Sequence, residues 1–232
     1  MRTIARTALD ERETRKARRR YDRIAPVYDL LNRAVEHLHY SGWRPLVWER
    51  VTSGRILEVG IGTGANLPYH PEGVRVVGVD LSGRMLARAA ALRGERPRPD
   101  LVQMDAQAMG FRKESFDAAV GTFVFCSVPD ALRGLAEVRR VLRPGGRLLL
   151  LEHVRSGSPV LGRLMDWMNP LVVRTMGVNI DRDTVGTVRR AGFEIEEDRP
   201  LDRRRIFRLI AAVRPQSDEA ESRDLHPIRE TT

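Results

Sequence analysis

Glycines and acidic residues follow two predicted strands of this chain at the spacing of a nucleoside-binding site. One apolar run leads into the alternating glycines Gly60, Gly62 and Gly64, and a second run, residues 74–79, ends on Asp80. Glycine lets the backbone approach a ligand closely because it has no Cβ atom. A carboxylate at the tip of the second strand can accept both hydroxyl groups of a ribose. The spacing therefore predicts a site for an adenosine-containing cofactor.

The dinucleotide-binding fingerprint has a similar glycine spacing and an acidic residue about 20 residues further along the chain. Glu58 distinguishes the present pattern from it. A turn that binds pyrophosphate gains nothing from an anion two residues before its first glycine. Pyrophosphate also needs a helix N-terminus, whereas residues 66–71 contain two prolines and open a helix poorly. The pattern Glu-x-Gly-x-Gly-x-Gly favours a cationic, phosphate-free ligand. It resembles motif I of the class I S-adenosylmethionine (SAM) methyltransferases.

This resemblance implies which residues hold the two ends of SAM. The glycine backbone would wrap the methionine end, and Glu58 would approach the ammonium group directly or through water. Thr122 and Phe123, near the end of the fourth predicted strand, would border the same end.

The adenosine end of SAM would lie against residues that follow the second and third predicted strands. Asp80 would hold the ribose hydroxyls and Leu81 would pack on the adenine. Asp105 and Ala106 match the family position that reads the adenine amino group. The alternative is that both acids merely cap helices at strand ends. Their joint occurrence after successive strands favours the cofactor.

Strand and helix patterns alternate through most of the chain. Seven apolar runs predict strands at residues 55–59, 74–80, 101–104, 116–125, 147–154, 194–197 and 206–213. Helices are predicted at residues 4–20, 21–39, 43–51 and 181–190, and two more begin at the capping residues Ser82 and Asp130. The alternation predicts an α/β fold with a doubly wound, mostly parallel seven-stranded sheet. The last two strands leave no room for a crossover helix, so we expect them to form an antiparallel hairpin.

The length of 232 residues suits one α/β domain with short appendages. We expect N-terminal helices at 1–42 that cap the substrate, a SAM-binding domain at 43–215 with an insertion at 155–180, and a disordered tail at 216–232. The chain has a net charge of +9. Its charge pattern predicts neither a signal peptide nor a membrane-spanning helix, and its single cysteine fits a reducing compartment. These features predict a cytoplasmic protein, peripheral at the inner face of the membrane.

Residues 21–30, Tyr-Asp-Arg-Ile-Ala-Pro-Val-Tyr-Asp-Leu, form the most distinctive segment outside the cofactor motif. Together with residues 57–64, 78–82 and 151–154, they resemble the bacterial phospholipid N-methyltransferases. Those enzymes convert phosphatidylethanolamine stepwise into phosphatidylcholine. The quinone-biosynthesis C-methyltransferases share part of this opening, and small-thiol methyltransferases carry a similar Glu-His segment. The acceptor is therefore a phospholipid amine, or else a quinone precursor or another small molecule. The intact motifs disfavour a SAM-binding protein without catalysis.

Residues 159–180 are rich in large apolar side chains and include Arg163 and Arg174. Such a segment is too apolar for an idle surface loop and too interrupted to span a bilayer. It is expected to be an interfacial element, the wall of an acyl-chain groove, or a cap on the cofactor site. With eight basic residues among the first twenty, it predicts contact with an anionic membrane surface. The sequence shows no module that reads nucleic acid and no metal-ligand spacing, and Cys126 is expected to be a small buried hydrophobe.

Two tyrosines are the leading candidates for catalytic residues. The rings of Tyr21 and Tyr28 can attract a methylammonium group by cation–π interaction, although Tyr28 equally fits packing of its helix on the sheet. His153, directly after the fifth predicted strand, is a proton acceptor, a partner of the substrate phosphate or a structural histidine. The residues expected near the entrance are His37, His39 and Tyr40.

Overall fold

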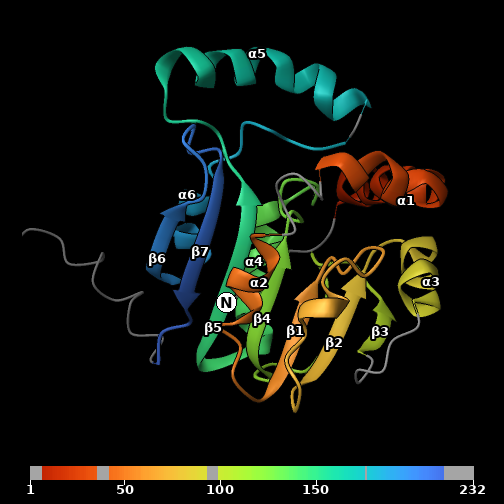
Figure 1. Ribbon diagram of the computed structural model, residues 1–232, viewed down its shortest axis with the longest axis vertical. Helices are drawn as coiled ribbons and strands as arrows, with labels where there is room; N and C mark the ends of the chain where they lie inside the picture. The colour runs from red at the N-terminus through yellow and green to blue at the C-terminus, as the bar shows by residue number, and fades with distance from the viewer. Residues whose placement is uncertain (1–6, 36–41, 93–98, 176, 217–232) are drawn as a thin grey trace, which may run out of the picture.

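The computed structural model describes residues 7–35, 42–92, 99–175 and 177–216, and it contains one seven-stranded sheet in the order β3-β2-β1-β4-β5-β7-β6 (Figure 1). The first five of these strands are mutually parallel, whereas β7 is antiparallel to both β5 and β6. The strands are β1 (Arg55–Val59), β2 (Arg75–Asp80), β3 (Asp100–Gln103), β4 (Phe116–Thr122), β5 (Leu142–His153), β6 (Glu194–Pro200) and β7 (Phe207–Val213). The predicted doubly wound sheet with a C-terminal antiparallel hairpin is confirmed.

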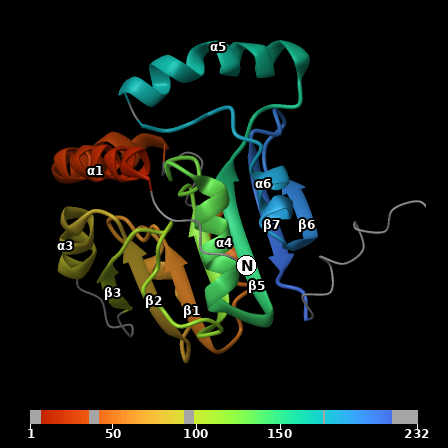
Figure 2. The same cartoon turned by 180° about the vertical axis from the view of Figure 1, so that it is seen from behind.

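Helices cover both faces of this sheet (Figure 2). The helices are α1 (Ala8–Val35), α2 (Arg44–Trp48), α3 (Gly83–Ala91), α4 (Ala131–Val141), α5 (Pro159–Thr175) and α6 (Thr184–Arg190), and a short 3-10 helix, η2, covers Leu67–Tyr69. One core cluster joins α4 and α6 to the sheet, and a second joins α2 to the opposite face. Alternate residues of β4 belong to the two clusters, as expected for a central parallel strand buried on both sides.

The predicted helix caps of α3 and α4 are present. The Ser82 hydroxyl accepts a hydrogen bond from the backbone N–H of Met85 at 3.1 Å, and the Asp130 carboxylate accepts one from Arg133 at 3.0 Å. Ser82 comes directly after β2, and Asp130 ends the loop that follows β4. They therefore fix where the polypeptide turns away from the sheet.

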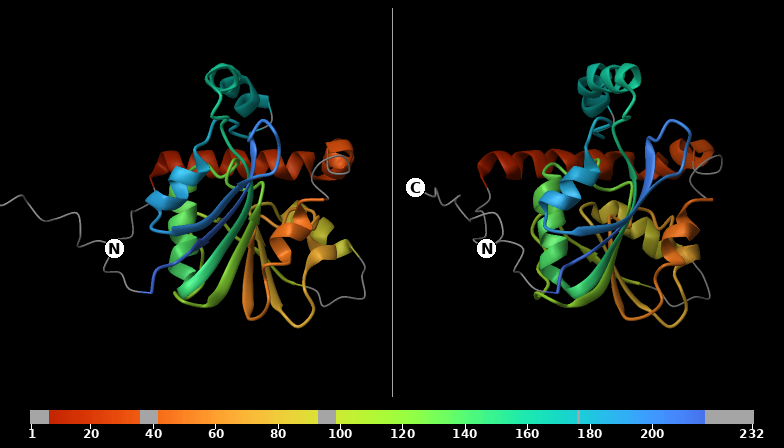
Figure 3. Two further views of the ribbon diagram at one scale, coloured as in Figure 1. Left: turned by 60° about the vertical axis from the view of Figure 1, so that its left-hand side comes forward. Right: turned by 90° about the vertical axis from the view of Figure 1, so that its left-hand side faces the viewer.

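The N-terminal part of the chain forms one helix of 28 residues, so the predicted division at Tyr21 is wrong. Residues 36–39 of the second predicted segment, and with them His37 and His39, lie outside the described residues, as do Tyr40 and residues 217–232. Pro26 lies inside α1 but does not end it. Asp22 and Asp29 tie the helix to α3 through Ser82 and Arg88. These tertiary contacts hold α1 across the carboxyl ends of the strands (Figure 3).

Strand β4 ends at Thr122, three residues before the predicted end. Phe123 adopts a positive φ of 54°, a conformation that side chains other than glycine rarely adopt. The buried carboxylate of Glu152 then accepts hydrogen bonds from the backbone N–H groups of Val124 and Phe125, both at 2.9 Å. A side chain thus replaces a neighbouring strand as the hydrogen-bond partner, and the chain turns into a loop.

Candidate functional site

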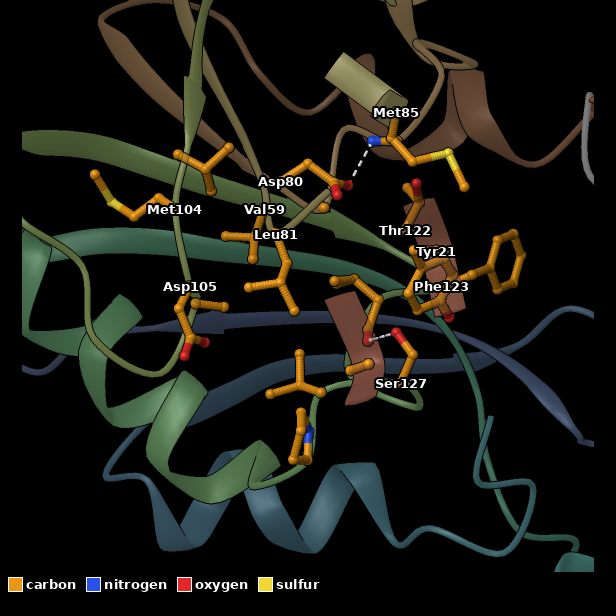
Figure 4. Close-up of a pocket in the computed structure, with 18 of the residues that line it drawn as sticks. Tyr21, Val59, Asp80, Leu81, Met85, Met104, Asp105, Thr122, Phe123 and Ser127 are labelled. Carbon is orange, nitrogen blue, oxygen red and sulfur yellow. Dashed lines mark hydrogen bonds between the residues drawn. The ribbon is translucent and has the colours of Figure 1, made fainter. Parts of the chain in front are cut away.

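A pocket of about 750 Å³ opens at the carboxyl ends of the parallel strands, beneath α1 (Figure 4). Its walls come from the ends of β1, β2 and β4, the loops after β3 and β4, and one face of α1. Open α/β sheets bind ligands at this edge.

Asp80 lies at the tip of β2 with both carboxylate oxygens held by backbone donors. Oδ2 accepts a hydrogen bond from the N–H of Gly62 at 2.9 Å, and Oδ1 accepts one from Ser82 at 2.8 Å. Burial raises the pKa of Asp80 to about 6, although these two donors act in the opposite direction. The adjacent Leu81 also lines the pocket. The carboxylate is therefore fixed in orientation and can accept ligand hydroxyl groups.

Asp105 and Ala106 line the pocket directly after β3. The Oδ1 atom of Asp105 accepts hydrogen bonds from the backbone and side chain of Gln107 at 2.9 and 3.0 Å. Its Oδ2 atom accepts one from the hydroxyl of Thr14 at 3.4 Å, so this acid also contacts α1. The structure thus brings Asp105 and Asp80 to one pocket, as the spacing predicts.

Two of the three motif glycines line the pocket. Gly60 and Gly62 have positive φ values of 70° and 57°, and a Cβ atom at Gly60 would overlap the side chain of Val124. A side chain at Gly60 would therefore be crowded by Val124, and the positive φ at both positions favours glycine. Gly64 does not line the pocket. A Cβ atom at this position would overlap the side chain of Leu67.

Glu58 lies behind the pocket wall rather than in it. Its side chain is fully buried, and its two oxygens are hydrogen-bonded to Asn66 Nδ2 at 2.6 Å and to His70 Nε2 at 2.9 Å. Thr122, in contrast, lines the pocket, and its hydroxyl oxygen accepts a hydrogen bond from Asn66 at 3.0 Å. Glu58 can therefore orient Asn66 and Thr122, but it meets the pocket only through them.

Tyr21 and Tyr28 both line the pocket from α1. Ala17 lines it as well, and the spacing of four and seven residues places all three on one face of the helix. The phenol of Tyr21 is hydrogen-bonded to Ser127, and burial raises the pKa of this phenol well above its usual value. Tyr21 therefore remains a neutral hydrogen-bonding group.

His153 lies outside the pocket. Its ring packs edge-on against Phe207 with centroids 5.3 Å apart, and its Nδ1 atom is buried without a hydrogen-bond partner. Burial lowers the pKa of His153 to about 4, so the imidazole is neutral near pH 7. The structure does not bring this predicted catalytic residue together with the two tyrosines.

Several pocket residues have no motif in the sequence. The loop after β4 contributes Val124, Ser127, Val128 and Pro129, and Met85 and Met104 form apolar walls. For pocket residues outside the motifs, the sequence offered one signal: the spacing of Ala17, Tyr21 and Tyr28, which places them on one face of a helix. The loop could not have been foreseen because its course depends on Glu152, a residue far along the chain.

Known proteins are similar to this chain in sequence and in fold. The family described as "Methyltransferase domain" matches residues 57–150. A phosphatidylethanolamine N-methyltransferase of Cereibacter sphaeroides is 43% identical over 111 residues, which cover 46% of this chain and 55% of that protein. A ubiquinone/menaquinone biosynthesis C-methyltransferase of Syntrophotalea carbinolica is 37% identical over 163 residues, which cover 67% of this chain and 68% of that protein.

The chain thus spans about half the length of the first relative and about two thirds of the second. Among solved structures, a SAM-dependent methyltransferase of Thermotoga maritima, described as a possible histamine N-methyltransferase, has a TM-score of 0.66 at 22% identity. It covers 84% of this chain and 99% of its own, and at this identity it shows the fold alone. The shared domain, sheet and strand-end pocket give one conclusion: the chain belongs to the class I SAM-dependent methyltransferases.

Proposed function

We propose that this methyltransferase moves methyl groups from SAM to the amine of phosphatidylethanolamine and of its methylated intermediates. Among the described residues that line the pocket, the charged side chains are Asp80 and Asp105, both carboxylates, and α1 adds the rings of Tyr21 and Tyr28. Such a pocket suits a cationic cofactor and an acceptor that becomes a methylammonium ion. The similarity to a phosphatidylethanolamine N-methyltransferase supports the same assignment.

The order of the strands supports one orientation of SAM in the pocket. The strands β3, β2, β1 and β4 are neighbours in that order, and all four contribute to the pocket at their carboxyl ends. Asp105 and Gly60 follow β3 and β1, whereas Asp80 and Thr122 are the last residues of β2 and β4. We infer that Asp105 and Ala106 hold the adenine, and that Asp80 and Leu81 hold the ribose. The methionine end then lies along Gly60, Gly62 and Thr122. When bound, SAM supplies an electrophilic sulfonium methyl group for in-line displacement.

Positioning and exclusion of water are the main contributions of the protein to such a transfer. Tyr28 and Tyr21 would orient the amine through their hydroxyl groups and hold the growing methylammonium by cation–π attraction, worth about 0.5–2 kcal/mol. The high pKa of Tyr21 keeps its phenol protonated and able to donate. The amine proton would leave to water at the pocket mouth.

The solvent-facing side of α5 supports an acceptor that resides in a membrane. Five large apolar side chains of this helix are 39–81% exposed, and their spacing confines them to a sector of roughly 100°: Val160, Leu164, Trp167, Met168 and Leu171. Gly162 and Met165 are buried on the opposite side. The exposed residues Arg163 and Arg174 both lie along one edge of the apolar face. This is the pattern of a helix that lies in the interface of an anionic bilayer.

The position of α5 agrees with this role. It lies beyond α1, on the side of the molecule toward which the carboxyl ends of the parallel strands point (Figures 1 and 3). The pocket lies at these strand ends. A membrane contact through α5 would therefore bring lipid head groups close to the pocket. None of the helices in the described part of the chain combines the length and apolar character needed to cross a bilayer.

A quinone precursor is the second candidate acceptor, because the quinone-biosynthesis relative covers more of the chain than the phospholipid enzyme does. A prenylated ring would also reside in the membrane, so α5 fits both acceptors. The two are separated by methyl transfer from labelled SAM to vesicles that contain either phosphatidylethanolamine or a demethylated quinol. We expect label in the phospholipid; label only in the quinol would replace the proposal by the second candidate.

A further inference from the structure

The turn between β6 and β7 contains three consecutive arginines, Arg203, Arg204 and Arg205, and all three are exposed. Phe207, the first residue of β7, pairs with His153, the last residue of β5. The turn therefore lies at the carboxyl end of β5, on the side of the molecule where α5 lies (Figures 1 and 3). Among the described residues, no carboxylate pairs with any of these three guanidinium groups.

Asp202, directly before the arginines, holds the backbone of the turn instead of pairing with their side chains. Its Oδ1 atom accepts hydrogen bonds from the N–H groups of Ile206 and Phe207 at 2.8 and 2.9 Å. Its Oδ2 atom accepts one from the N–H of Arg204 at 3.0 Å. Arg205 has a positive φ of 56°, a conformation that residues other than glycine rarely adopt. The carboxylate thus fixes the turn, and the three positive charges stay available to a partner outside the chain.

The turn is joined to the start of α5. The hydroxyl of Ser156 donates a hydrogen bond to the carbonyl of Arg204 at 3.3 Å and accepts one from the N–H of Ser158, directly before α5, at 3.2 Å. Asp166, the one acidic residue in α5, is neutralised by Arg155, which donates to both of its oxygens at 2.7 Å. The arginine turn therefore continues the exposed apolar face of α5 with positive charge that no acid of α5 compensates.

Positive charge beside an exposed apolar face is complementary to an anionic bilayer, in which phosphate groups lie above the acyl chains. Guanidinium groups bind phosphate strongly through paired hydrogen bonds. We propose that residues 202–206 form a binding site for the phosphate of an anionic phospholipid, separate from the lipid whose amine is methylated. Nucleic acid also carries phosphate, but it offers nothing to the apolar face of α5. The inference rests on the membrane contact proposed for α5, and it holds whichever acceptor is methylated.

The test removes charge from the turn and measures co-sedimentation with two kinds of vesicle, without SAM or phosphatidylethanolamine. Arg203→Gln combined with Arg204→Gln should weaken binding to vesicles of phosphatidylglycerol and phosphatidylcholine roughly 10- to 30-fold, because each arginine near an anionic surface is worth about fivefold. Binding to vesicles of phosphatidylcholine alone should stay within about twofold of wild type. The matched control is Arg112→Gln combined with Lys113→Gln, an exposed pair in the loop before β4, at the amino end of that strand. Its binding to both vesicles should be unchanged.

Each other outcome overturns the proposal. Equal losses in the turn variant and the control would mean that net charge alone attracts the protein to the vesicle. Normal binding of the turn variant to anionic vesicles would exclude the turn as the site. If that variant instead lost affinity for a single-stranded RNA oligonucleotide, the turn would be assigned to nucleic acid. Thermal unfolding should be the same in both variants and the wild type, since all four side chains are exposed. None of these measurements involves methyl transfer, so failure here leaves the proposed acceptor intact.

Discussion

The position of Asp80 in the pocket and its raised pKa make the affinity for SAM depend on pH. Its pKa of about 6 in the free protein means that it is partly protonated in mildly acidic solution. Only the ionised carboxylate can accept hydrogen bonds from both ribose hydroxyls. We predict that the affinity for SAM is constant above pH 7. Below pH 6 it should fall by up to about tenfold for each decrease of one pH unit. Calorimetric titration between pH 5 and 8 measures this.

The control for this prediction is Asp80→Asn, which cannot ionise. It should bind SAM weakly at every pH in that range. A wild-type affinity that does not change between pH 5 and 8 would contradict the role of Asp80 as the ribose acceptor.

The raised pKa of Glu152 implies that the stability of the folded protein, rather than its affinity for SAM, depends on pH. Burial raises the pKa of Glu152 to about 7, so the folded protein binds this proton more tightly than the unfolded chain does. The resulting stability is fully present below the ordinary pKa of 4.5 and is lost as the pH rises through 7. Its size is on the order of 3 kcal/mol at most, since a tenfold change in proton affinity corresponds to about 1.4 kcal/mol.

Glu152→Gln keeps an oxygen for the N–H groups of Val124 and Phe125 but removes the titration. We predict that its free energy of unfolding changes less between pH 5 and 8 than that of the wild type. Urea unfolding at both pH values measures the difference. Parallel pH profiles for the two proteins would show that Glu152 does not titrate in this range.

Tyr28 is predicted to act on the acceptor and not on SAM. Tyr28→Phe keeps the ring in the pocket wall but removes the hydroxyl that orients the amine. We expect SAM affinity within about twofold of wild type and turnover lowered at least about tenfold, a loss typical of a positioning group. Steady-state methyl transfer and SAM titration give the two numbers. Tyr69→Phe, outside the pocket, should leave both unchanged, and normal turnover in Tyr28→Phe would exclude a role for its hydroxyl.

At the scale of elements, α5 provides a test of the membrane contact. Trp167→Ser combined with Leu171→Ser removes two large apolar groups that are 77% and 63% exposed. We predict that vesicle binding falls more than about tenfold, because burying each such group is worth about 1.5–3 kcal/mol. The free energy of unfolding should change by less than about 0.5 kcal/mol per site. Co-sedimentation with anionic vesicles and thermal unfolding measure these effects.

Leu92→Ser is the control for α5. Leu92 is 50% exposed, directly follows α3 and does not line the pocket. Vesicle binding should be unchanged in this variant. If the α5 double variant also binds normally, the membrane contact does not involve α5.

The elements with strong local signals were predictable, and those shaped by distant partners were not. Strand β1 was predicted at its observed bounds, and the caps Ser82 and Asp130 mark the starts of α3 and α4. The early end of β4 was missed because it depends on Glu152, which is 27 residues after Phe125. The continuity of α1 was missed because it depends on contacts with α3 that no local pattern records.

The same reason explains which site residues the sequence could predict. Asp80, Asp105, Gly60 and Gly62 lie in one pocket because each follows a parallel strand, and strand order can be inferred from the alternating pattern. Hydrogen bonds to His70 and Asn66 hold the carboxylate of Glu58 behind the residues that line the pocket. Neither partner has a recognisable spacing in the sequence. Likewise, no pattern indicated that His153 would pack on Phe207.

At the scale of the whole molecule, the cofactor pocket, α1 and α5 lie at one end of the sheet (Figure 3). This arrangement joins the proposed methyl transfer with the proposed membrane contact: a lipid head group that enters near α5 would meet the tyrosines of α1 beside the bound cofactor. We therefore predict that the methylated product remains in the bilayer.

Mass spectrometry of lipids measures whether phosphatidylethanolamine is the methyl acceptor. The full chain is incubated with SAM and vesicles that contain phosphatidylethanolamine and an anionic phospholipid. We predict head groups that have gained one, two or three methyl groups, and no such products with Asp80→Ala. Phosphatidylethanolamine that stays unmethylated, under conditions where calorimetry shows bound SAM, would contradict the proposed acceptor.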